Sequence, residues 1–326
     1  MDNFADRLGA RIFECNNPTV MGLDPLTEYL PQEIRRKHGL ATADDPGSII
    51  YSDVKNQKDE YMARAANAIL EFNMLLIDAV SGIIPAVKPQ IAYYEILGHA
   101  GIKAYTETIT YAKKHDMLVI ADAKRNDIGS TASMYSSAFL GETDTSTPER
   151  FSAFDADALT VNAYTGYDGI EPFIKDCKTY DKGIFILVRT SNPPAAAFQD
   201  LNLENGKYRY EAVAEKVALW GKDLVGHNGY SSVGAVVGAT WPEQAGILRR
   251  LMPETFILVP GYGAQGGTGE TVSACFDKRG GGAVVNASRS LMLAYRNKGN
   301  GSDDLQTSAY NEAIRMKNDL NSHIFA

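Results

Sequence analysis

Two hydrophobic patterns alternate along the chain. Short runs rich in aliphatic and β-branched residues predict buried strands at 19–23, 83–87, 117–121, 158–161, 183–188, 233–237, 256–259 and 283–285. Between them, apolar residues recur every three or four positions, which predicts helices at 60–80, 93–115, 130–140, 169–180, 208–225, 242–251 and 270–278. This alternation of strand and helix predicts a parallel sheet covered by helices.

Eight strand–helix units favour an α/β fold of the (β/α)₈ TIM-barrel type, although a doubly wound open sheet is the alternative that strand counting leaves open. Polar residues follow nearly every predicted strand, and a barrel would gather them at one mouth, namely Asp24, Lys88, Asp122, Lys124, Asn162, Thr190, Ser191, Gly261 and Arg289. That convergence favours the barrel.

The whole chain, 1–326, is expected to form one barrel domain with insertions after strand 1 and after strand 3. The first insertion, 31–59, should be a long loop, and the second, 141–150, should link two helices. The C-terminal part, 299–326, should form a linker followed by a closing helix over 304–321.

Composition excludes several classes of function. The net charge is −8 and no polybasic tract occurs, which argues against nucleic acid as a partner. Cys15, Cys177 and Cys275 lack CxxC spacing, so neither a zinc site nor a disulfide framework is indicated, and the histidines lack metal-ligand or triad spacing. No apolar stretch approaches a membrane span and no signal peptide is evident, so we expect a cytoplasmic protein without a membrane partner.

The first candidate site is a group of charged residues after the third predicted strand. Asp122, Lys124 and Asp127 follow the run 117–121, and Lys88 follows the preceding strand. Because strand side chains alternate between faces, Asp122 and Lys124 should point the same way. Such a group alone is more often a surface ion-pair network. At a barrel mouth, however, interleaved lysines and aspartates would keep each other ionised and place an ammonium beside an anionic reacting centre.

The second candidate is a glycine-rich loop, 260–269, which follows strand 7. Its Gly261, Gly263 and Gly266 would let backbone N–H groups approach a phosphate, and Arg289 after strand 8 could bind the same group bidentately. Loops after strands 7 and 8 often hold phosphate in such barrels. The loop matches neither a P-loop nor a dinucleotide fingerprint, and a flexible loop is the simpler alternative.

Two further strand ends carry weaker signals. Asp24 could accept hydrogen bonds from sugar hydroxyls, although an aspartate before proline is common in turns. The segment 189–193 holds Ser191 and could contact the edge of a heterocycle, with a plain turn as the alternative.

At these residues the chain resembles the orotidine 5'-phosphate decarboxylase family. The resemblance rests on Gly-Leu-Asp-Pro at 22–25, Lys88, Asp-x-Lys-x-x-Asp-Ile-Gly-x-Thr at 122–131, the loop 260–267 and Arg289, all in family order. It implies a TIM-barrel homodimer that converts orotidine 5'-monophosphate to UMP and CO₂ in pyrimidine biosynthesis, without metal or organic cofactor.

The same resemblance implies roles for individual residues. Lys88, Asp122, Lys124 and Asp127 would form the catalytic array, with Lys124 as the proton donor. Asp127 would reach into the partner subunit's site, accompanied by Ile128 and Thr131. The remaining substrate contacts would come from Asp24 for ribose, Ser191 for the pyrimidine, Gln265 and Arg289 for phosphate, and Asn162.

Three alternatives remain open from the residues. A magnesium-dependent keto-sugar phosphate decarboxylase or a phosphohexulose synthase would share the barrel and an Asp-x-Lys element, but would need a carboxylate pair suited to a metal. An aldolase could use Lys88 or Lys124 as a Schiff base. A non-catalytic nucleotide-binding barrel is the alternative outside enzymology.

Overall fold

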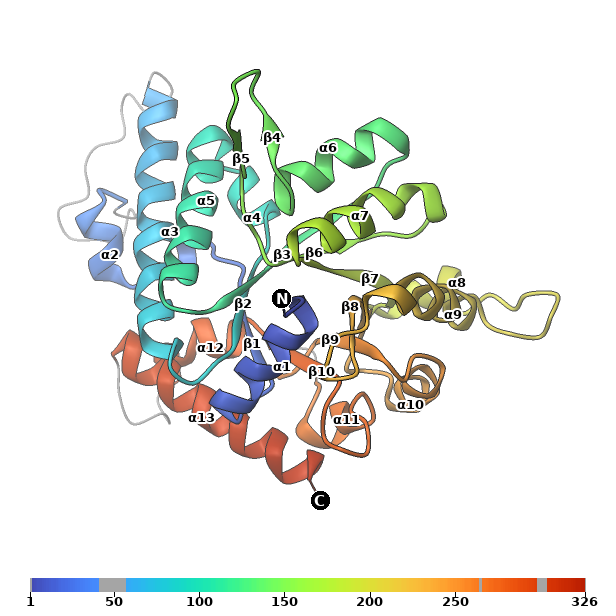
Figure 1. The fold of residues 1–326 in the computed structure, drawn as a ribbon. Coiled ribbons are helices and arrows are strands. Elements are labelled where there is room, and N and C mark those ends of the chain that lie inside the picture. The colour runs from blue at the N-terminus through green and yellow to red at the C-terminus, as the bar shows by residue number, and fades with distance from the viewer. Residues whose placement is uncertain (1, 41–56, 264–265, 298–303, 326) are drawn as a thin grey trace.

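The computed structural model describes residues 2–40, 57–263, 266–297 and 304–325. Within these ranges, eight parallel strands close into a barrel in the order β1-β10-β9-β8-β7-β6-β3-β2 (Figure 1). The strands are β1 (Thr19–Leu23), β2 (Ala86–Pro89), β3 (Leu118–Arg125), β6 (Ala158–Val161), β7 (Gly183–Arg189), β8 (Ser231–Val237), β9 (Thr255–Pro260) and β10 (Ala283–Ala287). The predicted barrel is therefore confirmed, and the open sheet is wrong.

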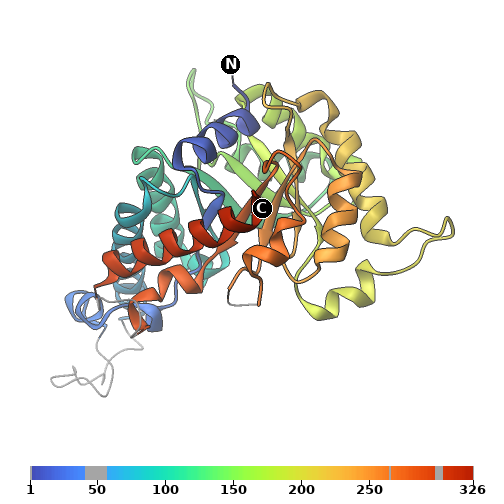
Figure 2. The ribbon, with the colours of Figure 1, turned by 90° about the horizontal axis from the view of Figure 1, so that it is seen from below.

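Helices surround the barrel on its outside, except α1 (Phe4–Cys15), which lies across one end of it (Figures 1 and 2). The other helices are α2 (Gln32–Lys37), α3 (Lys58–Val80), α4 (Ala92–Glu95), α5 (Gly98–Lys114), α6 (Gly129–Phe139), α7 (Glu171–Tyr180), α8 (Ala196–Gln199), α9 (Arg209–Gly221), α10 (Pro242–Leu251), α11 (Gly269–Ser273), α12 (Arg289–Met292) and α13 (Leu305–Ile324). The closing helix α13 packs against α3 and α11, and the Asp304 side chain caps it by accepting a hydrogen bond from the Thr307 N–H.

The barrel interior is filled at its N-terminal end by apolar side chains and closed by α1. Phe4 and Leu8 of α1 pack against strand residues such as Val20 and Val284. The Phe4 ring meets the Phe185 ring edge-on, with 5.9 Å between the ring centroids. Because this end is plugged, the opposite mouth, at the carboxyl ends of the strands, is the end that can hold a site.

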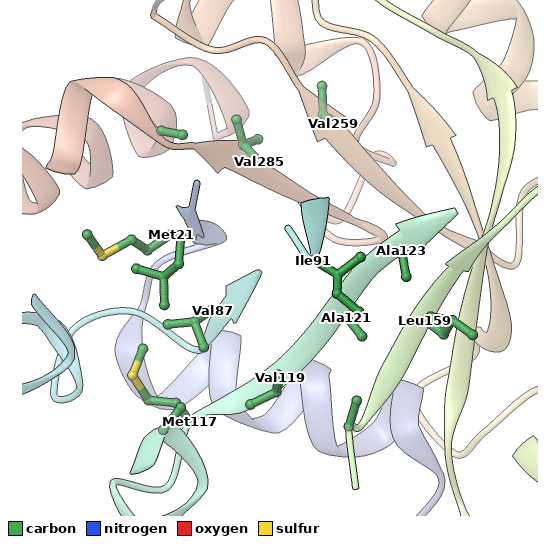
Figure 3. Close-up of a cluster of buried hydrophobic side chains, with 14 of the residues drawn as sticks. Met21, Val87, Ile91, Met117, Val119, Ala121, Ala123, Leu159, Val259 and Val285 are labelled. Carbon is green, nitrogen blue, oxygen red and sulfur yellow. The ribbon is translucent and has the colours of Figure 1, made fainter. Parts of the chain in front are cut away.

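Alternate strand residues face outward to the helices. Figure 3 shows this layer on six of the strands, with Met21, Val87, Val119, Leu159, Val259 and Val285. These side chains share one buried cluster with helix residues such as Phe72 and Ile109. Since side chains alternate along a strand, the neighbours of these residues point into the barrel.

Several predicted boundaries are corrected. The helix predicted at 93–115 is two helices, α4 and α5, separated at Gly98, whose φ of +60° is left-handed. The helix predicted at 270–278 ends at Ser273. Strands β2 and β3 extend further than predicted, so that Lys88, Asp122 and Lys124 lie within strands rather than after them. Charged residues extend these strands because each has a partner at the mouth, as described below.

The insertion predicted at 141–150 was expected to link two helices, and that is wrong. It carries a two-stranded antiparallel hairpin, β4 (Thr143–Asp144) and β5 (Arg150–Phe151), between α6 and β6. The loop predicted at 31–59 contains α2 and the first residues of α3, and its residues 41–56 lie outside the described ranges. In the described part of the chain, no helix is long and apolar enough to cross a membrane.

Candidate active site

Asp122 is the centre of a buried charged cluster at the barrel mouth. The Lys88 ammonium donates to Asp122 Oδ2 and the Lys124 ammonium donates to Asp122 Oδ1, each at 2.6 Å. The hydroxyl of Thr160 on β6 also donates to Oδ1, at 2.9 Å. Asp122 is only 7% exposed and Lys88 5%, whereas the Lys124 side chain is 46% exposed. Asp122 and Lys88 are therefore buried, whereas the Lys124 side chain reaches solvent.

Mutual pairing decides the charge state of this cluster. Burial alone would raise the pKa of Asp122, but the two ammonium groups outweigh burial and hold that pKa well below its usual range. Burial likewise opposes the charge on Lys88, yet Asp122 and Asp24 raise its pKa above the ordinary lysine value. Asp122 and Lys88 are thus ionised together at neutral pH.

An irregular strand places Lys124. The pairing of β3 with β6 shifts between Ala121 and Arg125, and Lys124 has a φ of +46°, which is unusual for a residue with a Cβ. The Thr160 oxygen stabilises this kink by accepting hydrogen bonds from the N–H groups of Ala123, at 3.1 Å, and Lys124, at 3.0 Å. Thr160 therefore binds both the carboxylate and the backbone that carries the lysine.

A cavity of about 410 Å³ opens above this cluster. Five of its lining residues were predicted from strand ends, namely Asp24, Lys88, Asp122, Gly261 and Arg289. The sequence did not single out six others, Tyr29, Tyr93, Pro260, Tyr262, Asn286 and Ser288. Tyr29 and Tyr93 stand in segments without a motif, whereas Tyr262 lies within the predicted glycine-rich loop. Asn286 had a readable signal, because a polar residue interrupts the apolar end of a predicted strand.

The glycine-rich loop forms one wall of the cavity. Gly261, Gly263 and Gly266 have φ values of +104°, +71° and +89°, which residues with a Cβ rarely adopt. The loop folds back on itself, since the Gly263 N–H donates to the Gly267 carbonyl and the Gly267 N–H donates to the Gly261 carbonyl. Gln265, the predicted phosphate ligand in this loop, lies outside the described residues.

Asp319 of α13 holds both ends of this loop. Its Oδ2 accepts a hydrogen bond from the Tyr262 hydroxyl at 2.5 Å and another from the Gly269 N–H at 2.9 Å. The sequence offered no signal for this contact, because the closing helix lies some fifty residues after the loop in the chain.

Four predicted site residues are not among those that line the cavity, namely Lys124, Asp127, Ile128 and Thr131. The Asp127 carboxylate accepts a hydrogen bond from the N–H of Ile128, and within the described residues no ion pair joins it to Lys88 or Lys124. Ile128 is 54% exposed, and Thr131 is also exposed. A single chain therefore brings together three members of the predicted four-residue array.

Two other predicted substrate contacts also lie outside the cavity lining. Asn162 Oδ1 accepts a hydrogen bond from the Tyr164 N–H, and the residue lines a neighbouring cavity of about 510 Å³. The Ser191 carbonyl accepts a hydrogen bond from the Thr240 hydroxyl. If Asn162 and Ser191 contact the substrate as predicted, the substrate must extend out of this cavity.

Acidic and histidine side chains close enough to share a metal occur away from the mouth. In the described part of the chain, the group that meets this criterion is Asp2, Asp6 and His227, beside α1 and the loop before β8. Those elements lie at the plugged end of the barrel. At the mouth, Asp122 is already paired with two ammonium groups, which is a poor arrangement for a cation ligand.

Comparisons with known proteins agree with this geometry. Residues 53–301 match the sequence model of the Orotidine 5'-phosphate decarboxylase / HUMPS family. Proteins named orotidine 5'-phosphate decarboxylase are similar over nearly their whole length: one from Rhodopirellula baltica is 44% identical, covering 91% of this chain and 90% of that protein, and one from Caldicellulosiruptor saccharolyticus is 40% identical, covering 99% and 100%.

Solved structures give the same result. The structure of a putative orotidine-monophosphate-decarboxylase from Toxoplasma gondii is similar with a TM-score of 0.75 and 28% identity, covering 99% of this chain and 98% of that one. Leishmania donovani OMP decarboxylase is similar with a TM-score of 0.71 and 27% identity, covering 99% and 100%. The chain belongs to the orotidine 5'-phosphate decarboxylase family.

Proposed function

We propose that this chain decarboxylates orotidine 5'-monophosphate to UMP and CO₂, the last step of de novo pyrimidine nucleotide synthesis. One observation carries the proposal: the buried Asp122 carboxylate, held between two ammonium groups, lines one cavity together with Lys88 and Arg289. Family membership and the names of the full-length relatives point to the same reaction.

The reaction requires electrostatic stabilisation. Loss of CO₂ from C6 of the pyrimidine leaves an electron pair in the plane of the ring, where the π system cannot delocalise it. The Lys124 ammonium, held on Asp122, would lie beside this carbanion and then transfer a proton to C6. Its partial exposure fits a group that must be reprotonated after each turnover. Lys88 keeps Asp122 ionised and fixed, so the Lys124 position is set before substrate arrives.

Binding energy would come from the other end of the substrate. Arg289 and the loop around Gly261, with Gln265, would bind the phosphate, while Asp24 would bind the ribose between phosphate and base. Ser191 and Asn162 would contact the pyrimidine side. In this way, contacts far from the breaking bond can help to stabilise the transition state.

We also propose a cytoplasmic homodimer in which Asp127 completes the partner's array, with Ile128 and Thr131 alongside. Two features support this: Asp127 is not paired with the described lysines of its own array, and the apolar Ile128 side chain beside it is largely exposed. Mixing two inactive variants, Lys124→Ala and Asp127→Ala, should restore activity because a hybrid dimer has one intact site. If the mixture stays inactive while hybrids form, the shared site is wrong.

The test of the reaction is direct. Chelator-treated protein is mixed with orotidine 5'-monophosphate, and the loss of the orotate-type ultraviolet absorbance is followed. We expect turnover that Lys124→Ala abolishes, whereas Lys103→Ala, an exposed lysine on α5 paired with Glu107, should leave it unchanged.

Each alternative has its own outcome in this assay. Loss of turnover after chelation, restored by magnesium, would favour the metal-dependent sugar-phosphate enzymes. Inactivation by borohydride in the presence of substrate would favour a Schiff base on Lys88 or Lys124. Nucleotide binding without turnover would favour a non-catalytic nucleotide-binding barrel.

A further inference from the structure

A further polar side chain, Asn286, points into the barrel and lines the cavity beside the charged cluster. In β10, Val284 belongs to the interior layer under α1 and Val285 to the outer layer, so Asn286 points inward by alternation. Figure 3 shows Val285 in that outer layer. Asn286 is 6% exposed and lines the same cavity as Lys88 and Asp122.

Asn286 differs from the cluster of Lys88, Asp122 and Thr160 in having an unused acceptor, a feature that it shares at this cavity with Asp24, whose Oδ1 also has no partner among the described residues. Lys88, Asp122 and Thr160 bond to one another. The Asn286 amide N–H donates only a long hydrogen bond, 3.4 Å, to the Ser288 hydroxyl, and its Oδ1 has no hydrogen-bond partner among the described residues. Buried amide oxygens are rarely left unpaired, so a buried acceptor that faces a cavity indicates a ligand donor.

Gly22 keeps the space in front of this acceptor open. Strand β1 lies between β10 and β2. It pairs with β10 on one side, and on the other side its residue Gly22 is in register with Lys88 of β2. A Cβ at position 22 would lie 3.1 Å from Asn286 Oδ1 and would collide with the Ser288 hydroxyl. Because glycine is present, no side chain of β1 separates Asn286 from Lys88.

We infer that Asn286 Oδ1 accepts a hydrogen bond from a ribose hydroxyl of the bound nucleotide. This inference rests on the proposed function. Asn286 precedes Arg289, the proposed phosphate ligand, by three residues, and Gly22 lies between Asn286 and Lys88 of the catalytic array. Asn286 would therefore face the part of the substrate between the phosphate and the reacting carbon. The ribose joins those two parts of the substrate. A phosphate dianion has no proton to donate, whereas the ribose has two hydroxyl donors.

The consequence is a specificity for ribonucleotides that has two sources, Asp24 and Asn286. A site built to pair with a hydroxyl discriminates against an analogue that lacks it, because the buried acceptor then stays unpaired. Asn286 would thus contribute to recognition of the sugar rather than to proton transfer.

The experiment compares three substrates, the ribonucleotide and its 2'-deoxy and 3'-deoxy analogues, in wild type and Asn286→Ala. We expect Asn286→Ala to lower kcat/KM on the ribonucleotide roughly tenfold, the effect of one lost hydrogen bond. On the analogue that lacks the donor, the same substitution should change kcat/KM by less than about twofold. Asn321→Ala, which removes an amide on α13 that bonds to the Asn16 carbonyl, is the control and should change none of the three values.

An equal loss on all three substrates would overturn the inference, because Asn286 would then act through Lys88 or the fold. Asn286→Ser gives a second, smaller polar variant should the alanine variant fail to fold. A crystal structure of the wild type with UMP decides independently: Oδ1 within about 3.2 Å of a ribose hydroxyl supports the inference, and a distance beyond about 3.5 Å to both hydroxyls refutes it. Wild type that does not decarboxylate orotidine 5'-monophosphate would instead refute the proposed function.

Discussion

Thr160 is the residue whose replacement tests the site most sharply, because one hydroxyl connects the carboxylate to the strand that carries the lysine. Thr160→Val replaces that hydroxyl with a methyl group and keeps the branched shape. The change removes the hydrogen bond to Asp122 Oδ1 and leaves the N–H groups of Ala123 and Lys124 without their acceptor.

The magnitude follows from these three bonds. A hydrogen bond to a charged group contributes about 1.5–3 kcal/mol, and each neutral backbone bond about 0.5–1.5 kcal/mol. Part of this loss is recovered, since Lys88 and Lys124 still neutralise Asp122 and the Lys124 N–H is only partly buried. We expect the free energy of unfolding to fall by about 3 kcal/mol. Because Lys124 loses a support of its left-handed backbone, we expect kcat to fall about 100-fold, the effect of a misplaced catalytic group.

The assay combines denaturant unfolding with steady-state kinetics of Thr160→Val and of its control, Thr160→Ser. Serine keeps the oxygen that accepts and donates, so it should retain most of the stability and of kcat. Wild-type kcat in the valine variant would refute the claim that the hydroxyl positions Lys124. Damage in the serine variant alone, with wild-type behaviour of the valine variant, would show that the methyl group, not the hydroxyl, matters.

Three further predictions follow from the same geometry. Tyr262→Phe and Asp319→Asn should each raise KM several-fold with little change in kcat, and the double variant should be no worse than the poorer single variant, because the two residues share one hydrogen bond that holds the glycine-rich loop. Gly22→Ala should lower both kcat/KM and the melting temperature, since the new methyl group would collide with the Ser288 side chain and crowd Asn286 at the cavity. Burial alone would raise the pKa of Asp277, but hydrogen bonds lower it to about 2. The ionised carboxylate therefore stabilises the fold at pH values above the unfolded-state pKa near 4, and this stabilisation is lost as the pH falls through about 2. Asp277→Asn should therefore cost about 1–2 kcal/mol at pH 7, after allowance for partial exposure, and the difference should disappear by about pH 2 in urea unfolding.

The barrel could be predicted from the sequence because hydrophobic periodicity encodes it locally. Each strand is a short apolar run, and each following helix has its own amphipathic pattern, so strand order follows from chain order. The insertion at 141–150 was misjudged for the complementary reason. Its hairpin is exposed, and two-residue strands without buried positions leave no periodic signal.

The sequence located residues of the cavity best where a charged residue directly follows an apolar run. Asp24, Lys88 and Asp122 have this signature, and the structure places them around one cavity. Contacts between distant segments have no such signature. Asp319 reaches the loop from the closing helix, and nothing near it in the sequence indicates that it contacts Tyr262.

Strand alternation predicted that Asp122 and Lys124 point the same way. The two side chains are in contact, but an irregular backbone rather than regular alternation brings them together. Regular alternation would require an extended backbone through Lys124, whereas its φ is +46° and the β3–β6 pairing shifts at that point. A left-handed residue with a Cβ costs about 1–3 kcal/mol and persists only when its surroundings fix it. Here the surroundings are the Thr160 oxygen on one side and Asp122 on the other. Because the kink ends the regular strand at Asp122, the lysine can reach solvent while its ammonium stays on a buried carboxylate. The left-handed backbone at Lys124 is thus the local feature that combines partial exposure of the proposed proton donor with its pairing to a buried carboxylate.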